Sequence, residues 1–265
     1  MTDLIYVYCI SEAPPKIVPQ LESSGLECLT IGGFFINIKN VSESNFSEAN
    51  LKKNLSDIQW LEIQVRDHIS VINSIMEYSA VIPFKFGTIY NTKASLEKFI
   101  ADYSDSLIEN FQQISGMEEW AVKIYCDRKL LSKKIDELSV EAASLQKQIS
   151  ESSPGKAFLL NKKKIDLIEN EMDRLCNQFG QEYYEEIKKL SESNSLNNLL
   201  PKEFTGREDS MIINASFLVK ASNVIDFKNH INSMSDRVGE SGFFIEVSGP
   251  WPPFSFISIK ERSNE

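Results

Sequence analysis

The chain has 265 residues, of which 42% are hydrophobic and 25% charged, a composition that suits a globular protein of one or two domains. Its net charge of −10 disfavours nucleic acid and anionic lipid membranes as partners, because both attract basic surfaces. The sequence has no apolar run long enough for a transmembrane helix, and its start, with Asp3 and no basic region, is not that of a signal peptide.

The first elements are predicted to be extended. The run "LIYVYCI" at 4–10 is rich in residues that favour strands, and we expect a strand there. The segments "LECLTIG" at 26–32 and "FFINIK" at 34–39 meet at Gly32 and Gly33, which predicts a β-hairpin.

Two amphipathic helices are expected next, at about 47–79 and 93–114. Asp57 is the predicted N-cap of the main part of the first helix. Its expected buried face consists of Ile58, Leu61, Val65, Ile69, Ile72 and Met76. The second helix is expected to bury Leu96, Phe99, Ile100, Tyr103, Leu107 and Phe111, and to end at Ser115 and Gly116. The stretch between them, 80–90, reads as extended, but Pro83 excludes an ordinary central strand.

A long helical hairpin at about 128–191 follows a strand at 118–127. Its first helix carries a seam with alternating spacings of four and three, made of Leu131, Ile135, Leu138, Ala142, Leu145 and Ile149. Ser153 and Pro154 are typical of a helix start. The second helix is expected to pack through Ile165, Ile168, Met172, Leu175, Phe179 and Tyr183. Two such faces joined by a short turn predict antiparallel packing.

The last part of the chain predicts a strand at 210–220, a helix at 223–238 and strands at 242–249 and 254–260. The order strand, hairpin, strand, helix, strand, strand is close to a ferredoxin-like arrangement with an enlarged first crossover. We therefore expect an α+β protein of two domains, 1–117 and 118–265. The second domain would be ferredoxin-like, with the long helical hairpin inserted in it.

The sequence offers no active site. His68 and His230 are isolated helical histidines, for which a structural role is expected, and "SPGK" at 153–156 lacks the upstream glycine of a phosphate-binding loop. The four cysteines are far apart and predict reduced thiols of a cytoplasmic protein, with no structural zinc. No metal or cofactor is expected, and binding or assembly is favoured over catalysis.

Four stretches occur in a distinctive order: "LIYVYCI", "VIPFKFGTIY", "SPGKAFLLNKKK" and "SGPWPPFSF". Together they resemble the gas vesicle protein family GvpL/GvpF over essentially the whole chain. Cys9, Lys85 and Phe254 depart from the alanine, arginine and tyrosine usual in that family, which bears on local contacts and not on membership.

The resemblance implies a non-catalytic, minor structural or assembly protein of gas vesicles in the cytoplasm. It also implies binding to the major shell protein and to other accessory vesicle proteins, with the N-terminal domain as the shell-binding part, and a ferredoxin-like fold. Two other functions stay open: a small-molecule-binding ferredoxin-like sensor or enzyme, and a coiled-coil scaffold that oligomerises through the seam at 131–149.

The residues that we expect to contact a partner are Pro83, Phe84, Lys85, Phe86, Gly87 and Trp251. An apolar partner surface would be covered by the phenylalanines or paired at the proline-interrupted edge. The alternative is that Phe84 and Phe86 belong to the core, and that Trp251 and its neighbouring prolines form a rigid structural corner.

Overall fold

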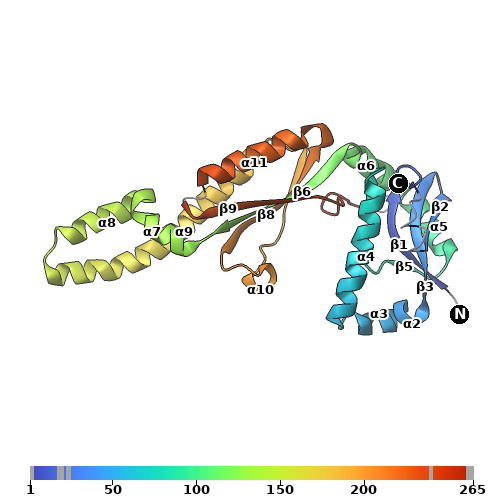
Figure 1. Ribbon diagram of the computed structural model, residues 1–265, viewed down its shortest axis with the longest axis horizontal. Coiled ribbons are helices and arrows are strands. Elements are labelled where there is room, and N and C mark those ends of the chain that lie inside the picture. The colour runs from blue at the N-terminus through green and yellow to red at the C-terminus, as the bar shows by residue number, and fades with distance from the viewer. Residues whose placement is uncertain (1–2, 17–20, 22–24, 239–240, 261–265) are drawn as a thin grey trace. The chain divides into compact units, whose positions relative to one another are not determined.

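The computed structural model describes residues 3–16, 21, 25–238 and 241–260. It divides into two compact units, Met1–Glu119 with Pro250–Glu265, and Trp120–Gly249. Helices and sheets occur in both units (Figure 1), so the α+β class is confirmed. The division differs from the expected one at the end of the chain, because the residues from Pro250 onward group with the first unit.

The first unit is built on an antiparallel sheet of β1 (Asp3–Ser11), β2 (Leu26–Ile31), β3 (Phe34–Ser42), β4 (Val81–Pro83) and β5 (Ile89–Tyr90). The strand order is β2-β3-β1-β4, and β5 also pairs with β1. The expected hairpin is β2–β3, with Ile31 opposite Phe34. Gly32 and Gly33 have φ values of 59° and 86°, which a tight two-residue hairpin turn requires.

Both faces of β1 are buried, which explains its nearly continuous apolar sequence. Ile5 and Val7 face one hydrophobic cluster, while Leu4 and Tyr6 face the other. The register of β1 against β3 shifts between Val7 and Cys9, which marks a β-bulge. Because a bulge adds one residue, Ile10 returns to the face of Ile5 and Val7.

One face of this sheet is covered by α4 (Ile58–Met76), with α2 (Glu43–Phe46) and α3 (Glu48–Asn54) before it. The single helix expected at 47–79 is therefore interrupted. Asp57 is confirmed as an N-cap, since its carboxylate accepts from the N–H groups of Gln59 and Trp60 at 3.0 and 3.2 Å.

The buried face of α4 differs from the expected one. Its buried residues are His68, Val71, Ile72 and Ile75. Ile58 is 79% exposed, and of the expected set only Ile72 is fully buried. Apolar periodicity alone predicts a different buried face, because the actual buried face of α4 has a polar residue, His68, among its buried positions.

The other face of the sheet packs against α5 (Lys93–Asp102) and α6 (Ser104–Ile114). The helix expected at 93–114 breaks at Tyr103, whose φ and ψ of −111° and 11° are not helical. Four of its predicted inward residues are buried: Leu96, Ile100, Leu107 and Phe111.

The C-terminal segment packs on α6 and is not a sheet strand. Asn110 of α6 replaces a strand partner: its Nδ2 donates to the carbonyl of Ser258 at 2.9 Å, and its Oδ1 accepts from the Ser258 N–H at 2.9 Å. Ser106 adds a hydrogen bond to the same carbonyl at 3.1 Å. The strand predicted at 254–260 is thus wrong, because its apolar residues Ile257 and Ile259 pack against the core of the first unit instead.

The second unit contains a sheet of β6 (Met117–Cys126), β7 (Ser193–Leu196), β8 (Ser210–Lys220) and β9 (Phe243–Trp251), in the order β7-β8-β6-β9. This order, with helices after the first and third strands, is ferredoxin-like, as expected. The strand that completes it is β7, which was not predicted because "SNSL" is polar and only partly buried. Further elements are α10 (Lys202–Thr205), the 3-10 turn Ala221–Asn223 and α11 (Val224–Val238).

The helical hairpin is confirmed as α7 (Arg128–Leu138), α8 (Val140–Ser150) and α9 (Pro154–Lys188). Its first helix breaks at Ser139, whose backbone is extended. The seam packs inside the chain: Leu131, Ile135 and Ala142 lie in one cluster with Met172 and Leu175 of α9. These seam residues are therefore not available for the oligomerisation that a coiled-coil scaffold would need.

Candidate partner-binding site

The predicted contact residues 83–87 run from the last residue of β4 into the turn that separates β4 from β5 at the edge of the first sheet. Both short strands pair with β1. The turn is closed by Thr88, whose backbone N–H and hydroxyl donate to the carbonyl of Lys85 at 3.1 and 2.7 Å. We call residues 83–88 the edge loop.

The backbone nitrogen of Pro83, in β4, points away from β1. The next residue, Phe84, donates its N–H to the carbonyl of Tyr8 at 2.9 Å, and inward and outward positions alternate along an antiparallel strand. A proline here costs no ladder hydrogen bond and removes a donor that another strand could use. The edge loop therefore favours side-chain contacts over strand addition.

His68 of α4 anchors the edge loop through its two ring nitrogens. Its Nε2 lies 3.0 Å from the carbonyl of Phe84, and its Nδ1 lies 2.8 Å from the hydroxyl of Tyr6. A carbonyl only accepts, so Nε2 carries the proton and Nδ1 accepts from Tyr6. The Tyr6 oxygen in turn accepts the N–H of Gly87 at 3.3 Å. Both ends of the loop are thus tied to one buried imidazole.

The surroundings keep this imidazole neutral. His68 is 1% exposed and stacks on Tyr8 at 5.5 Å between ring centroids. Burial lowers the pKa of His68, although its hydrogen bond to the Phe84 carbonyl opposes the shift. Burial likewise raises the pKa of Tyr6 and of Tyr8, so both phenols stay protonated.

The predicted contact residues differ in accessibility. Pro83 and Phe84 are buried, and Phe84 belongs to the cluster beneath α5 and α6. Phe86 is half-buried against the opposite cluster, beneath α4. Of residues 83–87 only Lys85 is exposed, and Gly87 has a φ of 79°, which favours glycine. The core alternative thus holds for Phe84, while Lys85 and part of Phe86 are presented outward.

Trp251 lies in a different stretch, at the end of β9, and is 42% exposed. The two prolines after it are buried, and the chain turns there, with the N–H of Phe254 donating to the carbonyl of Pro252 at 2.7 Å. Buried Glu119 holds this turn by accepting from the N–H and the hydroxyl of Ser255 at 3.1 and 2.6 Å. The chain turns here, and the turn presents Trp251 together with exposed Phe254.

The cavity beside the buried aromatic cluster is small, whereas a more open hollow of about 390 Å³, lined by Leu51, Gly87 and Ile89 among others, adjoins the edge loop. A cavity of about 60 Å³ lies beside the buried aromatic cluster, lined by Tyr6, Tyr8, Lys39, Val41, Phe46, Gln64 and Asp67. Typical ligand pockets are several times larger, roughly 300 to 1,000 Å³. Steric room therefore limits the smaller cavity to packing or a few waters.

Other groups with chemical potential are used in structural contacts. His230 pairs through Nε2 with Glu186 at 2.7 Å. All four cysteines are free thiols, as expected, and three of them are buried. Within the described ranges, no cluster of His, Cys, Asp or Glu is arranged to hold a metal, and no helix has the length and apolarity to cross a membrane.

Comparisons with known proteins agree on one family. The family model "Gas vesicle synthesis protein GvpL/GvpF" matches residues 4–258. A gas vesicle protein L from a Streptomyces species is 22% identical over 98% of this chain and 94% of its own length. A gas vesicle protein F from a Nostoc species is 23% identical over 81% of this chain and 83% of its own. The crystal structure of gas vesicle protein GvpF from Anabaena superposes with a TM-score of 0.66 at 19% identity, covering 99% of both chains.

Proposed function

This chain belongs to the gas vesicle synthesis protein family GvpL/GvpF, and we propose that it is a non-catalytic assembly protein that binds the major shell protein and other accessory vesicle proteins. Its place of action would be the gas vesicle, within the cytoplasm. The observation that carries the proposal is the family match over nearly the whole chain, because the fold by itself is compatible with many functions.

The edge loop is the proposed contact with the shell protein. A loop held at Phe84 and Gly87 by one buried histidine loses little conformational freedom when a partner binds, which favours affinity. Lys85 and the exposed part of Phe86 would make the contact, while Pro83 and Phe84 position them. Trp251 is proposed as a second contact, since tryptophan contributes strongly to binding when a partner covers it.

The absence of catalysis in this proposal is supported by how the polar groups are used. His68, the most buried histidine, has both ring nitrogens engaged and no room for a substrate beside it. His230 is engaged through Nε2 in a hydrogen bond with Glu186. A general acid or base needs an accessible proton position, which His68 does not have.

The test is capture of the major shell protein by the tagged full-length chain. Lys85→Glu and Trp251→Ala are expected to reduce capture, and Lys129→Glu, which changes another exposed lysine at the start of α7, is the matched control. If the wild-type chain captures no shell protein, the proposed contact is rejected. If all three variants capture it equally, the shell protein binds elsewhere on the chain.

A further inference from the structure

The end of the helical hairpin differs in charge from the rest of the protein. The ten residues 156–165 contain four lysines and no acidic residue, a charge of +4, while the remaining chain carries −14. Lys164 turns toward α8 and donates to Gln146 at 2.7 Å, but Lys156, Lys162 and Lys163 are exposed. An acidic protein thus displays a basic surface on one part of one helix.

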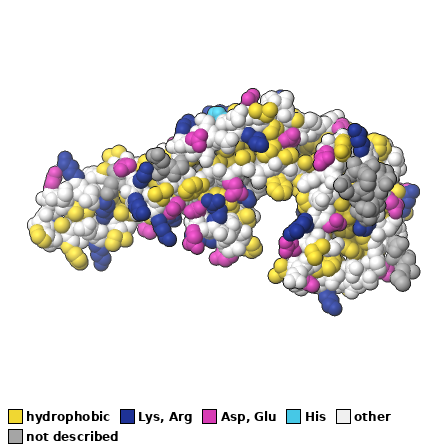
Figure 2. Space-filling model, viewed as in Figure 1, with side chains coloured by type: hydrophobic (Ala, Val, Ile, Leu, Met, Phe, Trp, Pro, Cys, Tyr) yellow, Lys and Arg dark blue, Asp and Glu magenta, His cyan; other side chains and the backbone are white. Residues whose placement is uncertain are grey.

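The same ten residues expose three large apolar side chains. Phe158, Leu159 and Ile165 are 72%, 63% and 65% exposed. Side chains of both kinds lie close together on the visible face of the hairpin (Figure 2). Leu160 beside them is less exposed, whereas the three apolar side chains are left largely open to solvent. Ile165, which the sequence pattern placed inside, is outside.

Spacing arranges these residues into a strip. Phe158, Lys162 and Ile165 are four and three residues apart and share one face of the helix, and Leu159 and Lys163 form the adjacent row. Phe158 and Ile165 are one heptad apart, the spacing at which a second helix places its apolar residues. We call Lys156, Phe158, Leu159, Lys162, Lys163 and Ile165 the arm strip.

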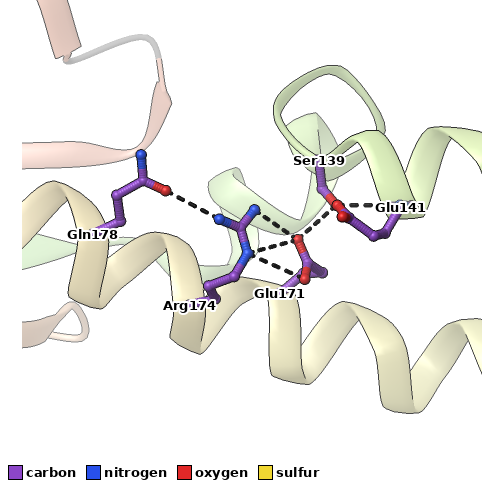
Figure 3. Close-up of polar contacts among 6 residues, drawn as sticks. Ser139, Glu141, Glu171, Arg174 and Gln178 are labelled. Carbon is purple, nitrogen blue, oxygen red and sulfur yellow. Dashed lines mark hydrogen bonds and ion pairs between the residues drawn. The ribbon is translucent and has the colours of Figure 1, made fainter.

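The helix that carries the arm strip, α9, is held near its middle by contacts with the start of α8. Ser139 caps α8 by accepting the N–H of Ala142 at 3.2 Å and donates to Glu171 of α9 at 2.6 Å. Arg174 donates to both carboxylate oxygens of Glu171 (Figure 3). The Arg174 guanidinium and the Ser139 hydroxyl hold the pKa of Glu171 below its usual value. These contacts fix the hairpin close to the arm strip in sequence, so the side chains of the strip project from a helix that is held in place.

We propose that the arm strip is a docking surface for an acidic amphipathic helix of a partner protein. The apolar side of that helix covers Phe158, Leu159 and Ile165, and its carboxylates pair with Lys156, Lys162 and Lys163. Charge favours this occupant over nucleic acid or an anionic membrane, because the −14 on the remaining chain repels extended anionic surfaces while a single helix meets only the strip. The surface is separate from the edge loop, and its occupancy does not depend on the shell-protein contact.

The experiment measures binding of a labelled helical peptide to the full-length chain by fluorescence anisotropy. The acidic probe has leucine at heptad a and d positions and glutamate at the solvent positions. A second peptide has the same composition but scatters its leucines around the helix, and a third replaces glutamate with lysine. We expect the acidic amphipathic probe to bind at least tenfold more tightly than either of the others, and more weakly as salt is raised.

Variants locate the contact. Phe158→Ser with Ile165→Ser is expected to weaken binding of the acidic probe tenfold or more, and Phe204→Ser, which removes an equally exposed side chain from α10, is the matched control. Lys162→Glu with Lys163→Glu is expected to reverse the preference, so that the lysine peptide binds better than the glutamate peptide. All of these positions are exposed, and circular dichroism checks that the fold is retained.

Four results would overturn the proposal. The first is that the acidic amphipathic probe does not bind, and the second is that the scrambled peptide binds equally well. The third is self-association of the chain that Phe158→Ser abolishes, which would make a second copy the occupant. The fourth is binding of the wild type to phosphatidylserine vesicles that the same variant abolishes, which would make a lipid surface the occupant.

Discussion

Replacing His68 tests whether one imidazole organises the edge loop. In His68→Leu an apolar side chain of similar size replaces the imidazole, and the carbonyl of Phe84 and the hydroxyl of Tyr6 lose their partner. In His68→Gln the amide oxygen and nitrogen can replace the two ring nitrogens, since they are spaced about as far apart. The two variants therefore differ mainly in whether the buried partners are satisfied.

The expected cost follows from burial and geometry. Both hydrogen bonds are short, at 2.8 and 3.0 Å, and both lie in the interior. A buried polar group without a partner costs about 1 to 3 kcal/mol. Two such groups, partly offset by the apolar leucine, predict a loss of about 2 to 4 kcal/mol in the free energy of unfolding of the first unit. His68→Gln should lose less than half of that.

Hydrogen exchange by mass spectrometry localises the effect, because the two units need not unfold together. In His68→Leu, protection of the amides of Phe84 and Gly87 should fall roughly 30-fold or more, the ratio that corresponds to about 2 kcal/mol. Protection within β8 of the second unit is the internal control. A loss below about 0.5 kcal/mol, or equal losses in His68→Leu and His68→Gln, would refute the anchoring role.

Four further results are expected. Below about pH 6.5 His68 takes up a proton in the unfolded chain but not in the folded chain, where burial lowers its pKa. The free energy of unfolding of the wild type should therefore fall by up to about 1.4 kcal/mol per pH unit more than that of His68→Gln, as measured by urea unfolding at several pH values. Gly87→Ala should lower the free energy of unfolding by about 1 to 2 kcal/mol, because φ is 79° at this position. The added Cβ would meet Leu51 only at an ordinary distance of 3.4 Å, so an unchanged thermal melt would argue against backbone strain. Asn110→Ala should release the C-terminal segment, with faster limited proteolysis at 254–260 and unchanged cleavage of the hairpin. Ser139→Ala removes a helix cap and should lower the stability of the second unit by about 1 to 2 kcal/mol, and an unchanged urea midpoint would contradict this.

Periodicity predicted much of the fold because it reports burial directly. The β2–β3 hairpin followed from two glycines between apolar runs, and the helical hairpin followed from two apolar faces joined by Pro154. The N-cap at Asp57 followed from local hydrogen-bonding chemistry. These features depend on residues close together in the chain, and sequence reasoning is strongest there.

Two of the errors have a different cause, namely polar groups with distant partners. The face of α4 was misplaced because His68 is buried by contacts 62 and 16 residues away, with Tyr6 and Phe84. The apolar pattern of the last segment predicts a strand, but the hydrogen bonds of Ser258 go to Asn110, 148 residues away. Strand β7 was missed because edge strands bury little and need few apolar residues.

The sequence predicted which stretch of chain to consider as a contact site, but not which of its side chains are exposed or which residues hold it in place. "PFKFG" stood out in the sequence, yet the division into buried Phe84 and exposed Lys85 depends on how the edge loop crosses the sheet edge. The anchors, Tyr6 and His68, lie far from the loop in sequence. A histidine in an otherwise apolar helical stripe, combined with tyrosines on a facing strand, is the one sequence signal that could have pointed to them.

Anchors and contacts are different residues here, and this separation lets experiment distinguish a role in folding from a role in binding. His68→Leu should lower both the protection of the edge loop and the capture of the shell protein, because it releases the loop without touching its outer surface. Lys85→Glu should lower capture alone, since the side chain is exposed and the Lys85 carbonyl, which closes the turn, is unchanged. If both variants lose capture while only His68→Leu loses protection, the loop binds through a pre-organised surface. If His68→Leu loses protection and still captures shell protein fully, the edge loop is a structural feature and the contact must lie on another surface of the chain.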